Sequence, residues 1–181
     1  MDVWCDALGS WLETTIGELS VSASTTKPTT SSASYGGDGE WLQTRPGEKC
    51  CIRVPAVDTG GAYSVVEIVS TPGDSTPMHI HSNEDEYFII LEGTALIALG
   101  DKTFDAAAGA TIFLPRNIPH AWGNASNSSL RFLGICTPGG VEDALRVIAR
   151  GGVSDLVAFS AKFGVEIVGP LLIQPEGHSP Q

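Results

Sequence analysis

Three of the four histidines in this chain fall in two short segments, together with one glutamate. His79 and His81 are separated by one residue, so on a β-strand both imidazoles would point to the same face. Glu86 follows after a short turn, and His120 comes later, behind a proline-rich turn at residues 115–119. Three imidazoles and one carboxylate are a donor set suited to a divalent first-row metal. The alternative is three ordinary histidines at the surface or in a core.

Such a donor set predicts a catalytic metal more than a structural one. Three histidines and one carboxylate leave coordination positions open, and water, dioxygen or a chelating substrate can occupy them. Iron, manganese, nickel, cobalt, copper and zinc all suit these donors. Glu86 has two possible roles, either as a charge-neutralising ligand or as a general base that takes a proton from a bound hydroxyl group.

The same two-residue period predicts the surroundings of the site. Phe88 and Ile90 share a strand face with Glu86, and Trp122 shares one with His120. A cluster of polar groups in an apolar shell is the usual profile of a small-molecule pocket. We therefore expect Phe88, Ile90 and Trp122 to line the substrate pocket.

Both segments resemble the two signature motifs of the cupin superfamily. The matching positions are Gly73, His79, His81, Glu86 and Gly93 in the first motif and Gly109, Pro115, His120 and Asn124 in the second. Asn117 stands where the family has glycine, a mild departure because asparagine tolerates the left-handed backbone conformation. The resemblance covers about residues 35–137. It implies that His79, His81, Glu86 and His120 are the metal ligands.

Short strands separated by turns follow one another from Trp41 onward, with no helix between them. This pattern predicts an all-β, antiparallel double-stranded β-helix, the jelly-roll barrel of the cupins. Strands are expected at 50–54, 63–69, 86–91, 95–99, 111–114, 120–122 and 130–135. After Pro138 the hydrophobic period becomes helical, which predicts two short C-terminal helices, the second capped by Ser154, and then a final strand over 165–173.

The chain divides into three parts on this interpretation: an N-terminal extension at 1–34, the cupin barrel at 35–137, and C-terminal helices and tail at 138–181. Residues 20–34 are almost entirely Ser, Thr, Ala and Pro, a composition typical of a linker. Before them, the spacing of apolar residues over 4–19 is compatible with a short amphipathic helix and equally with a poorly ordered tail.

The composition limits the kinds of partner and the cellular compartment expected for this protein. The net charge is −11 with ten scattered basic residues, which opposes nucleic-acid binding through clustered Lys and Arg. No apolar stretch reaches the length of a membrane span, and the start lacks the features of a secretory signal. Four cysteines without a disulfide or zinc spacing are typical of reduced thiols. We therefore expect a cytoplasmic protein with a small-molecule substrate.

The single cupin unit with a full ligand set resembles the bacterial flavonol (quercetin) dioxygenases. This resemblance implies a metal-dependent dioxygenase that acts on a small enolic or phenolic, flavonol-like substrate. Two alternatives stay open: a non-redox isomerase, cyclase or decarboxylase that uses the metal as a Lewis acid, and a non-catalytic small-molecule-binding protein. The resemblance, together with the open edges of a two-sheet sandwich, also implies a homodimer.

Overall fold

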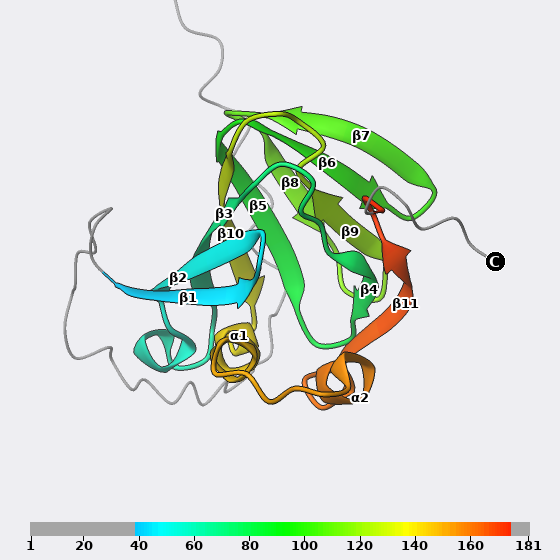
Figure 1. Ribbon diagram of the computed structural model, residues 1–181. Coiled ribbons are helices and arrows are strands. Elements are labelled where there is room, and N and C mark those ends of the chain that lie inside the picture. Colours follow the sequence, from blue (N-terminus) through cyan, green and yellow to red (C-terminus); the bar gives the residue numbers. More distant parts are fainter. Residues whose placement is uncertain (1–38, 175–181) are drawn as a thin grey trace, which may run out of the picture.

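The computed structural model describes residues 39–174, which form two antiparallel sheets packed face to face (Figure 1). In spatial order the six-stranded sheet consists of β1 (Glu40–Arg45), β2 (Glu48–Val54), β3 (Ser64–Ser70), β10 (Leu130–Thr137), β5 (Asp85–Glu92) and β8 (Thr111–Leu114). The five-stranded sheet consists of β11 (Val165–Leu171), β4 (Pro77–His81), β9 (His120–Gly123), β6 (Thr94–Leu99) and β7 (Lys102–Ala107). The predicted antiparallel jelly-roll barrel is confirmed.

Helices lie at the ends of the strands. A 3-10 turn, η1 (Ala56–Thr59), joins β2 to β3, and α1 (Val141–Ala149) and α2 (Leu156–Ala161) follow β10. The N-cap of α2 is Asp155, whose Oδ1 accepts a hydrogen bond from Ala158 N, and not Ser154 as predicted. The carboxylate one residue later matches the first helical turn. In the described residues, neither helix is long and apolar enough to cross a membrane.

Of two further strands, β11 was predicted from the sequence and β7 was not. β11 pairs with β4, so the final strand expected at 165–173 is confirmed and residues beyond Thr137 complete the barrel. β7 was not predicted, because this edge strand is mostly exposed and lacks a clear apolar alternation. The segments 4–19 and 20–34, expected as a helix or tail and a linker, lie outside the described residues.

The register of the six-stranded sheet arranges its inward-facing side chains in four rows. From one end to the other, the rows are Ser64–Cys136–Glu86–Leu114, Ile52–Val66–Gly134–Phe88–Ile112, Cys50–Ile68–Phe132–Ile90 and Glu48–Ser70–Leu130. The middle rows are mostly apolar, whereas each end row holds a buried glutamate. One sheet face therefore has a carboxylate at both ends and an apolar middle.

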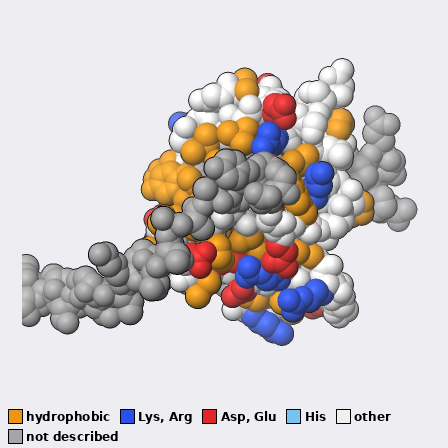
Figure 2. All heavy atoms as spheres, turned by 90° about the vertical axis from the view of Figure 1, so that its left-hand side faces the viewer, with side chains coloured by type: hydrophobic (Ala, Val, Ile, Leu, Met, Phe, Trp, Pro, Cys, Tyr) orange, Lys and Arg blue, Asp and Glu red, His pale blue; other side chains and the backbone are white. Residues whose placement is uncertain are grey.

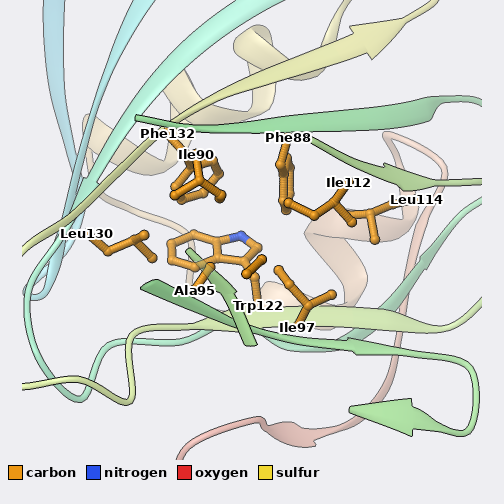
Figure 3. Close-up of a cluster of buried hydrophobic side chains, with 10 residues drawn as sticks. Phe88, Ile90, Ala95, Ile97, Ile112, Leu114, Trp122, Leu130 and Phe132 are labelled. Atoms are coloured by element: carbon orange, nitrogen blue, oxygen red, sulfur yellow. The ribbon is translucent and has the colours of Figure 1, made fainter. Parts of the chain in front are cut away.

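Trp122 of β9 lies at the centre of the hydrophobic core, between the side chains of the two sheets (Figure 3). Its ring centroid is 4.8 Å from that of Phe132, which in turn is 4.8 Å from that of Phe88. Aromatic pairs at this separation add to the stabilisation from burial. Because Trp122 comes from one sheet and the two phenylalanines from the other, this contact holds the sheets together.

Asn124, the last residue of the second motif, is fully buried and uses all of its side-chain polar groups. Its Nδ2 donates to Ser70 O at 3.0 Å and to Ser128 O at 2.8 Å, and its Oδ1 accepts from Ser126 N and Oγ. The side chain thus fastens the loop after β9 to the end of β3.

We expect Asn124→Ala to lower the free energy of unfolding by about 3 kcal/mol, because it leaves buried donors and acceptors without partners. Asn127→Ala is the matched control, since Asn127 is exposed in the same loop. Urea unfolding followed by circular dichroism measures both. Equal stabilities of the two variants would contradict this role.

Candidate metal centre

His79, His81, Glu86 and His120 converge inside the barrel. Their ligand atoms all lie within 4.8 Å of one another, and all four residues are largely or fully buried. Strand β4 supplies the first two histidines, β5 supplies Glu86 and β9 supplies His120. The β4–β9 pairing sets His79 directly opposite His120, so residues far apart in sequence become neighbours through strand register.

The turn before His120 is fixed to the same strand pair. Asn117 adopts a φ of 63°, the left-handed conformation for which glycine is the usual residue. Its backbone N–H donates to the carbonyl of His81 at 2.8 Å. Asparagine at this position therefore preserves the turn. The turn then places His120 beside His81.

Hydrogen bonds fix the tautomers of two histidines. His79 Nδ1 lies 2.8 Å from Pro77 O, and His120 Nδ1 lies 2.9 Å from Ile118 O. A carbonyl oxygen can only accept, so each Nδ1 carries a proton and Nε2 is the ring nitrogen available to a metal ion. The third ring has a side-chain partner instead, because His81 Nδ1 lies 3.3 Å from Glu84 Oε2. Such outer partners orient histidines for metal binding.

The inward-facing nitrogens surround the Glu86 carboxylate. His120 Nε2 is buried and has no hydrogen-bond partner, although Glu86 Oε2 lies 3.3 Å away out of alignment. His81 Nε2 is 3.9 Å from Glu86 Oε1. On the other side, the Cys136 thiol donates to Glu86 Oε1 at 3.4 Å. A buried nitrogen without a partner is costly, and a metal ion would satisfy it.

Electrostatics keep Glu86 and His79 in their metal-binding protonation states. Burial raises the pKa of Glu86, but the charge of His81 and the contact with His120 outweigh it and lower that pKa to about 2. Burial, followed by the charge of His120, lowers the pKa of His79 to about 4. Burial lowers the pKa of His81 too, yet Glu86 and Glu84 raise it overall. Metal binding would displace that proton.

A cavity of about 140 Å³ opens beside three of these four residues, His79, His81 and Glu86. Phe88 and Trp122 line it, as the sequence interpretation expected, whereas Ile90 packs in the hydrophobic core and does not line it. Val141 and Leu145 of α1 also line the cavity. This helix lies below the ends of β3 and β10 (Figure 1).

Several residues at the site were missed by sequence reasoning. Cys136 and Glu84 contact the histidine–glutamate cluster, and Arg45 and Glu48 line the far end of the cavity. The two-residue alternation along residues 130–137 was a signal for Cys136 facing inward. The positions of Arg45 and Glu48 depend on how β1 and β2 pair with β3, which local sequence does not reveal.

Residues 66–136 match the family model described as "Cupin domain". The donor set, its position inside the jelly-roll and this match agree, and residues 66–136 are a cupin domain. Within it, the cluster of three histidines and one glutamate suits a divalent metal ion.

Curated relatives match only part of the chain. Mannose-1-phosphate guanylyltransferase 2 of Escherichia coli O157:H7 is 37% identical over 60 residues, which are 33% of this chain and 12% of that protein. Uncharacterized protein MJ1618 of Methanocaldococcus jannaschii is 33% identical over 79 residues, or 44% of this chain and 63% of that protein. The chain thus spans less than two thirds of the length of either relative.

Solved structures share the fold. KdgF from Halomonas sp. superimposes with a TM-score of 0.57 at 15% identity, covering 63% of this chain and 99% of that one. The polyketide cyclase RemF from Streptomyces resistomycificus gives a TM-score of 0.53 at 22% identity, covering 60% and 80%. At such identities the similarity concerns the fold alone.

We expect His79→Ala and His120→Ala each to abolish stoichiometric metal binding, because each removes an Nε2 donor that the main chain orients. Metal content measured by inductively coupled plasma mass spectrometry, with circular dichroism to verify folding, tests this. His178→Ala is the control, since it changes the one histidine outside the two motifs. Full metal occupancy in both site variants would disprove the ligand assignment.

Proposed function

We propose that the chain is a metal-dependent enzyme, a dioxygenase that combines dioxygen with a small enolic or phenolic compound. His79, His81, Glu86 and His120 would hold one divalent transition metal. The observation that carries this proposal is the set of three Nε2 atoms and one carboxylate facing one point beside a cavity. The ion, when bound, would supply Lewis acidity and open positions for two reactants.

The size of the cavity limits the size of the substrate that it can hold. A cavity of about 140 Å³ is close to the roughly 150 Å³ of an engineered cavity that holds benzene in another protein. Drug-sized ligands usually occupy about 300–1,000 Å³. We therefore favour a single-ring compound over a three-ring flavonol. The rings of Phe88 and Trp122 would contact its apolar part.

The chain's own groups have distinct roles in this proposal. His79 and His120 hold their Nδ1 protons against backbone carbonyls and so keep Nε2 free for the ion. Glu86 is the anionic ligand, and a pKa of about 2 in the metal-free site makes it a weak base. This favours the ligand role over the general-base role that the sequence left open. The Cys136 thiol holds one Glu86 oxygen in place.

A non-redox enzyme on the same site is the second candidate. Imidazole and carboxylate donors suit zinc as well as iron, and a metal that does not change oxidation state would support cyclisation, isomerisation or decarboxylation. Solved structures with this fold include a polyketide cyclase and an oxalate decarboxylase from Lactobacillus farciminis, the latter with a TM-score of 0.51 at 19% identity. Guanylyltransferase activity is not proposed, because the chain covers only 12% of that relative.

A cytoplasmic homodimer that does not bind nucleic acid is part of the proposal. Tyr87 and Phe113 stack at 4.8 Å on the outer face of β5 and β8, where Phe113 is 49% exposed and Leu91 39%. Such an exposed apolar face is typical of a contact surface. On the face seen in Figure 2, basic, acidic and hydrophobic side chains are interspersed. Sedimentation of the purified chain tests the dimer.

The chain is expected to consume dioxygen with a single-ring catechol once it is loaded with iron, manganese, nickel, cobalt or copper in turn. An oxygen electrode measures this, with the zinc-loaded protein as the redox-inactive control. Turnover of an enolic compound without oxygen consumption would contradict the dioxygenase proposal and favour the non-redox enzyme.

Glu86→Gln should lower metal occupancy and turnover together, because it removes the anionic ligand. Turnover per bound metal should stay within about tenfold of the native value, since a weak base contributes little. Turnover rates divided by the measured metal content test whether Glu86 acts as a general base. A further fall of about 100-fold or more per bound metal would assign the general-base role to Glu86.

A further inference from the structure

The cavity has a second polar end that the metal site does not use. Glu48 faces inward from the last row of the six-stranded sheet, whereas Glu86 faces inward from the first row, and both line the same cavity. Glu48 is only 4% exposed. A buried carboxylate is expensive unless it is paired, so its partners determine what this end can bind.

The partners of Glu48 form a compact network. Its Oε2 lies 2.8 Å from Arg45 Nη2, and its Oε1 accepts a hydrogen bond from Thr44 Oγ1. The same guanidinium also donates to Asp74, from Nε at 2.5 Å and from Nη2 at 3.1 Å. Ser70 Oγ donates to Asp74 Oδ2 at 2.7 Å. Arg45 is therefore held between two carboxylates.

The charges of this network favour a hydrogen-bond donor over an anion. One guanidinium faces two carboxylates, and two of its three nitrogens already bind them. Each Glu48 oxygen makes one hydrogen bond, so each keeps acceptor capacity. A ligand hydroxyl group can use that capacity, whereas a carboxylate would be repelled.

An apolar surface separates the two polar ends. The Arg45 guanidinium lies over the Trp122 ring, 5.0 Å from its centroid, and Trp122 follows His120 by two residues on β9. Phe88 and Gly134 line the wall between the rows that hold Glu86 and Glu48. A Cβ at Gly134 would contact Phe88 at 3.7 Å, so the absence of a side chain leaves space there.

We propose that Glu48, held by Arg45 and Thr44, is a substrate-binding subsite that accepts a hydrogen bond from a neutral hydroxyl group. The substrate is then a single-ring compound with metal-binding oxygens at one end and an uncharged hydroxyl group at the other. Its metal-binding end rests on the proposed function. The subsite itself consists only of protein side chains and binds without the ion.

Metal-free wild-type protein tests the subsite directly. Benzyl alcohol and benzoate have the same ring and differ in the group that would meet Glu48. We expect benzyl alcohol to bind at least about tenfold more tightly at pH 7, because a hydrogen bond to a carboxylate replaces repulsion between two anions. Ligand-observed NMR titration measures both dissociation constants.

Two glutamate variants assign the preference to Glu48. Glu48→Gln should reduce the preference for benzyl alcohol to less than about threefold, because the acceptor loses its charge. Glu67→Gln is the matched control: Glu67 is also 4% exposed and paired with two arginines, Arg53 and Arg131, but it lies on the outward face of β3. This control should keep the wild-type preference.

The results separate the subsite from the metal proposal. Equal binding of the two compounds, tighter binding of benzoate, no binding of either, or an unchanged preference in Glu48→Gln would overturn the subsite. If Glu48→Gln does not fold, the wild-type comparison decides alone. Failure of the proposed function would instead appear as a lack of bound metal in the wild-type protein, with the benzyl alcohol preference intact.

Discussion

The site depends on hydrogen bonds from two imidazole Nδ1 atoms to backbone carbonyls two residues earlier. These bonds, from His79 to Pro77 and from His120 to Ile118, fix the protonated nitrogen on the outer side of each ring. The Nε2 atoms must then face the interior, where burial makes an unpartnered nitrogen costly. The two-residue period of the strands and the register between them then bring these nitrogen donors together around Glu86.

The two buried glutamates of the cavity illustrate how environment separates the roles of identical side chains. Glu86 is surrounded by imidazoles, which lower its pKa and keep it ionised. Glu48 is buried beside one arginine that it shares with Asp74, and burial raises its pKa. Carboxylates whose environments push their pKa values apart commonly serve different functions. This separation supports a metal ligand at one end and a substrate contact at the other.

The histidine–glutamate cluster and the barrel could be predicted from the sequence because their signals are local. The spacing of His79, His81 and Glu86, together with the resemblance to the cupin motifs, predicted their cluster, and the left-handed conformation expected at Asn117 is present. Local sequence pattern did not predict the surroundings of every residue. Ile90 alternates with Phe88 as expected, yet the barrel closes around it and places it in the core. The edge strand β7 escaped prediction because little of it is buried.

Some of the residues that line the cavity lie outside the stretch that holds the candidate metal ligands. All four candidate ligands lie within 66–136, the stretch that matches the cupin family. Arg45, Glu48 and the α1 residues Val141 and Leu145 lie outside it. Glu142 fixes α1 in place, since its buried carboxylate accepts from Ala56 N at 2.6 Å and Gly140 N at 3.1 Å. The flanking segments thus contribute to the size and polarity of the cavity, so substrate choice can change while the candidate metal ligands stay the same.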